Sequence, residues 1–509
     1  MSQESNKRIA KNTILLYIRQ FFTLLLALYT SRLTLQVLGE SDYGVFATVA
    51  GLAALISIVT SSMSVSTQRF MTFELGKGDI VKLNRVYVTG IQIHFFLALI
   101  LWFIAEIIGP WFIYNRMTIP EERVDCAFWV FQVSMMGCVL NLINVPNNAA
   151  IIAHEDMGVY AIFSIADALL KLVFVLLLFI IPWDRLFYYS LSILIIQSVD
   201  FLICYIFCRI KYEEVRYHHI LDKSLGKSML SLAGWSAVLN IAGSGYIQGV
   251  YVLLNVFFGP IVTAAYSIAM QAYSGIRSFC SSFQLASNPQ IVKLYSQGAI
   301  EEMNRLVMRV CKMCFFLILV LSLPFLLHAN FFLDLWLKDV PKYTESFFIL
   351  LLLYAYIDVL CYPMNTAAQA TGNVKIYNIV TSVFVLLPLL VSYVAYINGA
   401  NVEFVTECAI VMSLIGVYVR VFCLKWLTSF SMKLFFSTVV IPSVSVLTLS
   451  LLPLIVIRTY IINLYANVII TSVASIVISA IVIYGIGLDQ DERKFVKNST
   501  LSILSKFTK

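Results

Sequence analysis

Long apolar runs follow one another along almost the whole chain. An α-helix needs about 20 predominantly apolar residues to cross the ~30 Å hydrocarbon core of a bilayer, and the sequence holds fourteen such runs. They are too long and too continuous for the alternating strands of about ten residues that form outer-membrane barrels. The pattern therefore predicts an all-α integral membrane protein with about 14 transmembrane helices. The runs cover approximately 13–37, 43–66, 86–108, 127–153, 157–181, 186–208, 228–255, 263–287, 306–329, 346–370, 376–398, 402–424, 434–457 and 464–486.

Composition supports the same class of protein. Hydrophobic residues make up 60% of the 509 positions and charged residues 12%, whereas about a quarter of the residues in soluble domains are charged. The first apolar run follows Lys7, Arg8 and Lys11 and lacks a small-residue cleavage site. We therefore expect it to remain in the protein as a helix, because it does not match a cleavable signal peptide.

The basic residues predict the orientation in the membrane. With the N-terminus inside, the connections on the inner side carry 22 Lys and Arg residues and those on the outer side carry 6. Inner loops of membrane proteins are enriched in these residues. We therefore expect an even number of spans, with both termini in the cytoplasm. The net charge of +7 mostly reflects this asymmetry and gives no reason to expect nucleic acid as a partner.

The chain matches itself at a shift of about 220 residues. The matches keep their order along the chain: Gly78-x-Ile80-x-x-x-Asn84-Arg85 with Gly298-x-Ile300-x-x-x-Asn304-Arg305, Gly39 with Gly259, and Pro146 with Pro363. Six spans separate the copies, so both halves run in the same direction, as in parallel transporter repeats. We expect an N-terminal six-helix bundle over 1–210, a C-terminal six-helix bundle over 211–430, and two appended transmembrane helices with a cytoplasmic tail over 431–509.

Polar stripes on several spans predict a cavity between the two bundles. On each of spans 2, 8 and 10, several polar residues recur about every helical turn and therefore lie on one face of the helix. Single hydroxyls and amides can also hold helix pairs together, but four on one face in both halves favour a cavity lining. The stripes are Ser57, Ser61, Ser64 and Gln68; Arg277, Ser281, Gln284 and Asn288; and Asp358, Tyr362, Asn365 and Gln369.

Charged residues inside the spans are the strongest candidates for function, because each is costly in hydrocarbon. Asp167 and Lys171 are four residues apart and can neutralise one another. The arginines have no acid at helical spacing on their own helices, and a guanidinium binds phosphate through paired hydrogen bonds. We therefore expect some of them to bind an anionic headgroup. The candidates are Arg19, Arg32, Asp167, Lys171, Asp200, Arg277, Asp358 and Arg420.

Two prolines inside spans 4 and 10, Pro146 and Pro363, predict kinks. Such a kink serves either as a hinge for alternating access or as a fixed bend. No Walker A motif is present, so ATP is not expected as the direct fuel. The ten cysteines lie within or at the ends of apolar runs. We expect Cys311 and Cys314 to be small buried apolar side chains rather than a redox or metal site. We expect no enzyme activity, no metal and no organic cofactor.

Several short segments resemble one family, the polysaccharide repeat-unit flippases of the Wzx type, which export O-antigen and capsule units. This family belongs to the multidrug/oligosaccharidyl-lipid/polysaccharide exporter superfamily. The resembling segments are Lys11-Asn-Thr, Tyr29-Thr-Ser-Arg32, Leu38-Gly39-x-x-Asp42-Tyr43-Gly44, Ser66-Thr67-Gln68-Arg69-Phe70, Phe73-Glu74-Leu75-Gly76-Lys77-Gly78, Ala153-His154-Glu155-x-Met157 and Asn288-Pro289-Gln290-Ile291. The resemblance implies two six-helix bundles in a V, as in multidrug and toxic-compound extrusion proteins, with two extra helices.

The same resemblance implies a function. The substrate would be an undecaprenyl-pyrophosphate-linked oligosaccharide, moved from the cytoplasmic to the periplasmic leaflet of the bacterial inner membrane by alternating access. Coupling to an H⁺ or Na⁺ gradient and a polysaccharide polymerase complex as a partner would follow. The substrate-binding candidates are Arg277, Arg19, Arg32, Arg420, Lys171, Gln68, Gln284 and Asn288, and the coupling or gating candidates are Asp167, Asp200, Asp358, Pro146 and Pro363.

Three alternatives remain open on the sequence. An ion-coupled drug antiporter of the same superfamily would need an acidic cavity, whereas bases at least equal acids in these spans. A flippase for the peptidoglycan lipid precursor shares the appended helices and the cationic cavity, so the sequence separates it poorly. A membrane scaffold for glycan assembly would not need buried charges.

Overall fold

The computed structural model describes residues 3–115, 119, 121–216, 222–337, 340–461 and 463–494. Some side chains inside the first helix, including those of Arg32 and of 47–58, lie outside the described set. In the described part, all regular structure is helical and no strand occurs. The predicted all-α membrane fold is confirmed. Helices are also the expected outcome physically, because they satisfy every backbone hydrogen bond within one segment.

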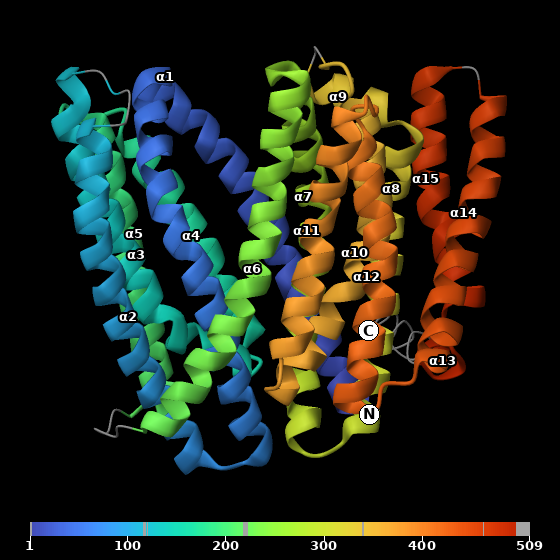
Figure 1. Cartoon of the computed structure of the whole chain (residues 1–509), viewed down its shortest axis with the longest axis horizontal. Coiled ribbons are helices and arrows are strands. Elements are labelled where there is room, and N and C mark those ends of the chain that lie inside the picture. The colour runs from blue at the N-terminus through green and yellow to red at the C-terminus, as the bar shows by residue number, and fades with distance from the viewer. Residues whose placement is uncertain are drawn as a thin grey trace, which may run out of the picture. The chain divides into compact units, whose positions relative to one another are not determined.

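Each predicted apolar run coincides with a helical region, with ends that differ by up to a few residues (Figure 1). Eleven segments of the described chain are long and apolar enough to cross a membrane. The remaining three runs lie in α1, which joins two of them across a non-helical Gly39, and in α7, whose polar stripe lowers its hydropathy.

The helices of the first half are α1 (Gln3–Lys77), α2 (Ile80–Asn115), α3 (Val124–Ala153), α4 (Met157–Leu177) and α5 (Arg185–Lys211). Those of the second half are α6 (Lys223–Phe258), α7 (Pro260–Ser296), α8 (Ile300–Leu327), α9 (Ala329–Leu337), α10 (Thr344–Thr371), α11 (Lys375–Ile397) and α12 (Phe404–Thr428). Then follow α13 (Met432–Phe435), α14 (Ile441–Tyr460) and α15 (Leu464–Val482), with short 3₁₀ or π segments at Glu121–Arg123 (η1), Glu213–Val215 (η2), Phe436–Val440 (η3) and Ile483–Gly487 (η4).

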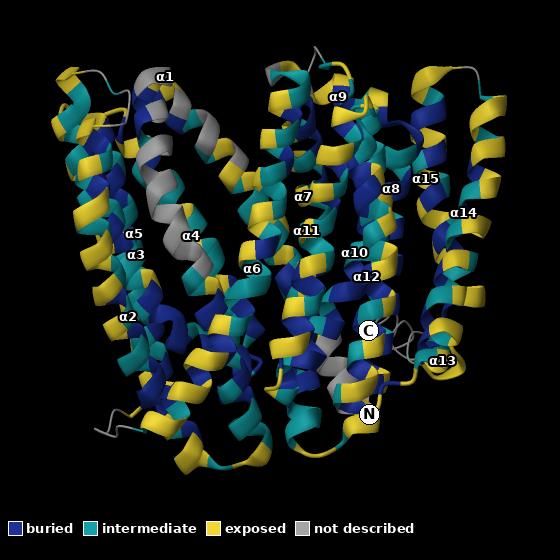
Figure 2. Cartoon of the chain, viewed as in Figure 1, coloured by how far each residue is buried: buried dark blue, intermediate teal, exposed yellow. Residues whose placement is uncertain are grey.

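The chain divides into two compact units. Unit 1 consists of Met1–Ile241, Leu285–Met303 and Gln369–Ile379, and unit 2 of Ala242–Gln284, Asn304–Ala368 and Val380–Lys509. In unit 2, α8 and α10 form the interior, since 61% of the most apolar window of each is buried by protein. In unit 1 the corresponding figure is 11% for α2 and α4, so protein fully buries little of either window, and Figure 2 shows many exposed residues along α2. Outward-facing phenylalanine and isoleucine side chains there suit lipid rather than water.

Glycines mark the same bends in both sequence halves. Gly39 (φ 75°) interrupts α1, and Gly259 (φ 86°) separates α6 from α7. Gly78 (φ 74°) and Gly298 (φ 77°) end the next helix in each half. Positive φ is accessible to glycine without a Cβ clash. The repeated glycines of the sequence are therefore repeated turns of the backbone.

The repeated asparagines have one structural role. Asn84 at the start of α2 donates its side-chain amide to the carbonyl oxygens of Glu214 at 2.6 Å and Arg216 at 2.8 Å, just beyond the end of α5. Asn304 near the start of α8 donates to the carbonyl of Thr428, the last residue of α12, at 2.8 Å. In each half, the third span thus caps the chain where the sixth span ends.

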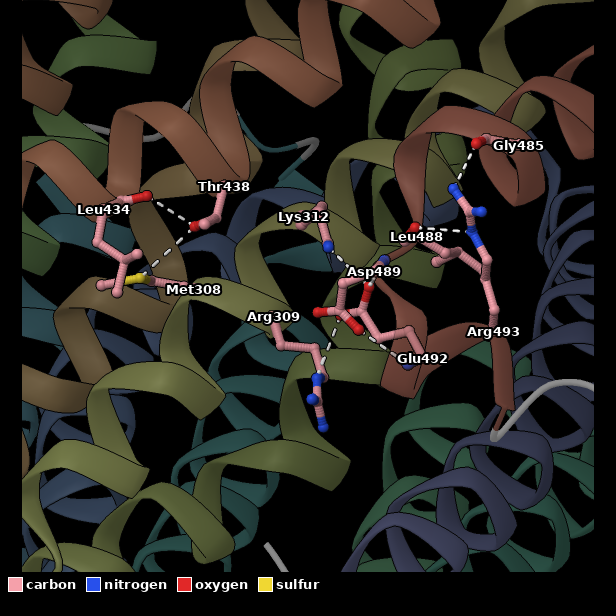
Figure 3. Close-up of polar contacts among 10 residues, drawn as sticks. All are labelled: Met308, Arg309, Lys312, Leu434, Thr438, Gly485, Leu488, Asp489, Glu492 and Arg493. Carbon is pink, nitrogen blue, oxygen red and sulfur yellow. Dashed lines mark hydrogen bonds and ion pairs between the residues drawn. The ribbon is translucent and has the colours of Figure 1, made fainter.

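The segment after α15 is anchored on α8 within unit 2 (Figure 3). Asp489 and Glu492 form a capping box, in which the Glu492 N–H donates to Asp489 Oδ1 at 2.8 Å and the Asp489 N–H donates to Glu492 Oε2 at 3.0 Å. The buried Glu492 carboxylate also accepts from Lys312 Nζ at 2.7 Å and from Arg309 Nε at 3.2 Å. Arg493 donates to the carbonyls of Leu488 and Gly485. These contacts fix the end of the appended pair to the C-terminal half.

The two asparagines provide a test of the repeat. We expect Asn84→Ala and Asn304→Ala each to destabilise the protein, because each leaves carbonyl oxygens without their donor, at a cost of about 1–3 kcal/mol. The measurement is thermal unfolding in detergent. Asn398→Ala is the control, since Asn398 is exposed and bonds only a carbonyl of its own helix. A control as damaging as the two variants would contradict the shared capping role.

A second test uses the predicted outer face of unit 1, where Arg123 donates to both Asp42 and Asp184. Partial burial alone would raise the pKa of Asp184, but the Phe187 N–H and the Arg123 guanidinium outweigh it and lower the pKa. Such a carboxylate stabilises the fold above its unfolded pKa of about 3.9, and this stabilisation is lost as the pH falls through the folded value.

We therefore expect Asp184→Asn to lower the melting temperature at pH 7 and to have a smaller effect at pH 3. Melting curves of both proteins across this range measure the difference. A difference that stays constant down to pH 3 would rule out a role for the ionised carboxylate.

Candidate functional site

A polar pocket of about 430 Å³ lies in unit 1, between α1, α4 and α5. Its lining includes Arg19, Thr23, Thr30, Ser164, Asp167 and Lys171. The sequence placed Arg19, Asp167 and Lys171 among the candidates, and the fold brings these three to one cavity. Hydroxyls and charges in this setting are suited to a polar, hydrogen-bonding ligand.

The pocket lining carries one more positive than negative charge. Lys171 Nζ lies 2.7 Å from Asp167 Oδ2, so these two neutralise one another as predicted. Arg19 has no acidic partner in the part of the chain that the structure describes; it stacks at 5.2 Å on the ring of Tyr160 and donates Nη2 to Gln20 at 3.2 Å. Its Nε is buried without a hydrogen-bond partner. Arg19 therefore gives the pocket lining a positive charge that no acid of the described chain pairs with.

A chain of buried polar side chains connects α2, α3 and α5. Tyr87 donates its hydroxyl to Asn147 Oδ1 at 2.8 Å, Asn147 donates to Asn144 at 3.0 Å, and Asn144 donates to Asp200 Oδ2 at 3.3 Å. Asp200 is also close enough to Asp167 for electrostatic repulsion. Pro146 lies between the two asparagines on α3. The helix is therefore polar where the proline interrupts its backbone bonding, and Asp200 lies at one end of this network.

In unit 2, the structure pairs two other candidates, Arg277 on α7 and Asp358 on α10. Arg277 Nε lies 3.1 Å from Asp358 Oδ2, and the guanidinium lies 4.4 Å from the centre of the Tyr362 ring. Tyr273 and Tyr354 donate their hydroxyls to the two oxygens of the same carboxylate at 3.3 and 3.4 Å. The charge of Arg277 is thus balanced in this structure. An anion binding there would compete with Asp358.

The other candidates are not among the residues of these two sets. Arg420 is buried on α12 with Nη1 over Gly416, where an added Cβ would lie 3.0 Å from it. Gln284 is buried and donates to Cys314 Sγ at 3.6 Å, and Cys311 donates to the Leu360 carbonyl. Gln68 and Asn288 are half-buried on α1 and α7, and Pro363 lies inside α10. Arg32 falls outside the described side chains.

A buried clasp, which the sequence did not predict, joins both halves of the chain within unit 1. Glu155, in the connection between α3 and α4, accepts from Lys293 Nζ at 2.6 Å and from Gln290 Nε2 at 2.7 and 2.8 Å. Asn12 on α1 donates to the Glu155 carbonyl at 3.3 Å. We call these four residues the Glu155 clasp. The Glu155 side chain is 0% exposed, and its backbone has a φ of 61°, a strained value for a residue other than glycine.

The sequence motifs contain two of the four clasp residues. Glu155 belongs to the Ala153-His154-Glu155 segment and Gln290 to the Asn288-Pro289-Gln290 segment, but nothing in either motif indicates that they meet. A second contact of this kind comes from Arg69, which donates Nη2 to the Ala370 carbonyl at 2.8 Å and stacks on Phe73 at 4.6 Å. Both contacts lie on the side predicted to be cytoplasmic, where they join segments of the two sequence halves.

Comparison with known proteins concerns the fold. No protein-family model and no curated protein matches the chain. Among solved structures, an outward-facing multidrug resistance MATE family transporter of the MOP superfamily aligns with a TM-score of 0.73 at 14% identity, over 84% of this chain and 96% of its own. The chain has the MATE fold.

Two further structures agree with this assignment. A MATE in the bent conformation aligns with a TM-score of 0.74 at 14% identity and the same coverage of 84% and 96%. A MOP superfamily transporter from Pyrococcus furiosus, described by the reversed polarity of its binding pocket, aligns with a TM-score of 0.73 at 14% identity, again over 84% and 96%. The MATE fold and the many apolar helices identify the chain as a multi-pass membrane protein.

The Glu155 clasp can be tested directly. We expect Glu155→Gln to destabilise the protein strongly, by about 3–5 kcal/mol, because it leaves the largely buried Lys293 without its counter-charge. The double variant Glu155→Gln/Lys293→Met should recover part of this loss, since the uncompensated charge is then removed. Thermal unfolding in detergent measures both effects.

The matched control is the exposed pair Asp79–Lys82, whose side chains are 35% and 62% exposed. We expect Asp79→Asn/Lys82→Met to change stability by less than about 1 kcal/mol. Equal losses in the two pairs, or no recovery in the Glu155/Lys293 double variant, would refute a specific buried charge pair.

Proposed function

We propose that this protein is a flippase for undecaprenyl-pyrophosphate-linked oligosaccharides, moving them from the cytoplasmic to the periplasmic leaflet of the bacterial inner membrane. The MATE fold supports a transporter, and the resemblance of the sequence motifs to Wzx-type flippases supports this substrate class. In the proposal, the units travel onward to surface polysaccharide such as O-antigen, and a polymerase complex uses them.

The observation that carries the proposal is the uncompensated Arg19 in a hydroxyl-lined pocket. A guanidinium with a free donor edge binds phosphate oxygens, and the serine and threonine hydroxyls can bind sugar. Lys171 can join Arg19 at the phosphate when a coupling cation takes its place at Asp167. This competition would couple substrate binding to H⁺ or Na⁺, with Asp167 as the coupling group.

Arg277 and Asp358 form the corresponding switch of unit 2. A pyrophosphate that binds Arg277 displaces Asp358, whose carboxylate then keeps the two tyrosine hydroxyls as donors. In this proposal each negative charge of the substrate takes the place of a carboxylate beside a basic residue. The basic residues of the two pairs, Lys171 and Arg277, are therefore not left without a counter-charge. Arg32, Arg420, Gln68, Gln284 and Asn288 remain further substrate-binding candidates in this proposal, and Asp200, Pro146 and Pro363 remain candidates for coupling or hinge motion.

The Glu155 clasp and the Arg69 contact support alternating access. They join segments of the two sequence halves by a small number of polar bonds, which can break as a set. In the proposal, their opening admits the substrate from the cytoplasm. About one sixth of the chain lies outside the MATE match, which is close to the share made up by 431–509. This supports the proposed division into 1–210, 211–430 and the appended 431–509.

An ion-coupled multidrug antiporter is the second candidate, and a peptidoglycan lipid-precursor flippase is a third. The antiporter is favoured by the carboxylates of Asp167 and Asp200 near one another and by the multidrug resistance transporter among the similar structures. A cationic drug, however, would meet Arg19 and Lys171 in the pocket, and both repel it.

The test uses a bacterial host that lacks its own repeat-unit flippase. We expect this chain to restore surface polysaccharide, and Arg19→Ala and Arg277→Ala to lower it at least tenfold, because each removes a phosphate-binding cation. Arg209→Ala is the control, since Arg209 is exposed and bonds only Tyr205 of its own helix. Quantified surface glycan and lipid-linked intermediates provide the readout.

Full export by both arginine variants, at equal protein levels in the membrane, would contradict the phosphate-binding role. Drug resistance without glycan export would favour the antiporter. Rescue of peptidoglycan synthesis alone would favour the lipid-precursor flippase.

A further inference from the structure

A second groove lies in unit 1, away from the polar pocket. It has a volume of about 720 Å³ and lies between α2 and the first turns of α6. One wall is apolar and is formed by Ile93, Phe96, Leu97, Ile100 and Leu230. Gly226 forms part of its floor, because a Cβ there would lie only 3.5 Å from Ile93 and 3.6 Å from Thr89.

The mouth of the groove is basic. Lys223 and Lys227 are exposed, lie four residues apart on the same face of α6, and form no ion pair within the described part of the chain. Asp222 also lines the mouth, but its carboxylate caps α6 by accepting from the Leu225 N–H at 3.0 Å and the Ser224 hydroxyl at 3.0 Å. The positive end of the α6 dipole adds to the two lysines. The mouth is therefore suited to an anion.

The apolar wall has the depth of one leaflet. From Thr89 to Ile100 the groove follows α2 over twelve residues, or about 16 Å at a rise of ~1.5 Å per residue. This is about half of the ~30 Å hydrocarbon core. The exposed Phe96 and Ile100 lie toward the deeper end, whereas the lysines lie at the predicted cytoplasmic surface. A charged mouth and an apolar wall of this depth match one lipid lying along the helix pair.

We propose that this groove binds an anionic phospholipid of the cytoplasmic leaflet, with its phosphate at Lys223 and Lys227 and an acyl chain along Phe96 and Ile100. A lipid-linked oligosaccharide fits less well, because the lining offers a sugar few uncharged polar groups: Thr89, Gln92 and Ser231. The bound lipid braces the start of α6 against α2. This part of α6, up to Ile241, belongs to unit 1, whereas the rest of the helix belongs to unit 2.

The experiment uses the purified full chain in detergent, with phosphatidylglycerol or phosphatidylcholine of equal chain length added as the probe. Native mass spectrometry counts the lipids retained. We expect the protein to retain phosphatidylglycerol in preference, and Lys223→Gln/Lys227→Gln to lower that retention at least fivefold. Lys425→Gln/Lys433→Gln is the control, because it removes the same charge from exposed lysines on the same predicted side and should leave retention unchanged.

A second pair of variants tests the apolar wall without changing the charge. Leu230→Gln introduces an amide into the groove and should also lower retention, whereas Ile241→Gln, on the exposed surface of α6 outside the groove, should not. Thermal unfolding of each variant verifies that it is folded.

Four results would overturn the proposal. They are unchanged retention in the Lys223/Lys227 variant, an equal loss in the Lys425/Lys433 control, no effect of Leu230→Gln, and displacement of phosphatidylglycerol by low concentrations of undecaprenyl phosphate. The last result would assign the groove to a polyprenyl lipid instead. None of these readouts depends on transport, so the proposal stands or falls separately from the flippase function.

Discussion

A charge in hydrocarbon must find a counter-charge, a dense set of hydrogen bonds or water, and the remaining features of this protein depend on that constraint. Three pairs of charges in or near the spans of the described chain meet it by pairing: Asp167 with Lys171, Arg277 with Asp358, and Glu155 with Lys293. Glu492 meets it with two bases and a capping box. Pairs of this kind contribute little net stability, but each becomes costly when one partner leaves. They are therefore well placed to couple ligand binding to structural change.

Arg19 departs from the pattern. It rests on an aromatic ring and one amide, and it lines the polar pocket without an acidic partner in the described part of the chain. Arg277 is its opposite, fully engaged with a carboxylate and an aromatic ring. The two arginines therefore differ in their surroundings: one has no acidic partner in the described chain, and the other is paired with a carboxylate.

The internal repeat was the feature of the sequence that predicted local structure most reliably. The glycines near residues 39, 78, 259 and 298 matched at a fixed shift, and all four adopt positive φ in the fold. Asn84 and Asn304 also matched, and both cap the end of a sixth span. The sequence could not show what these asparagines bind, because the carbonyls that they satisfy lie more than a hundred residues away. Motif residues such as Glu155 and Gln290 gave a family resemblance without revealing that they touch.

By itself, the sequence determined that the chain crosses a membrane as helices, because runs of about 20 apolar residues leave no other way to satisfy the backbone in lipid. It also determined the Asp167–Lys171 pair, since four residues bring two side chains together on any helix. Only the tertiary structure decided which charges remain unpaired. Whether Arg19 or Arg277 meets an acid depends on neighbouring helices distant in sequence, and no local pattern records their side chains. The same holds for the Glu155 clasp and the α2–α6 groove, which arise where segments from both halves pack together.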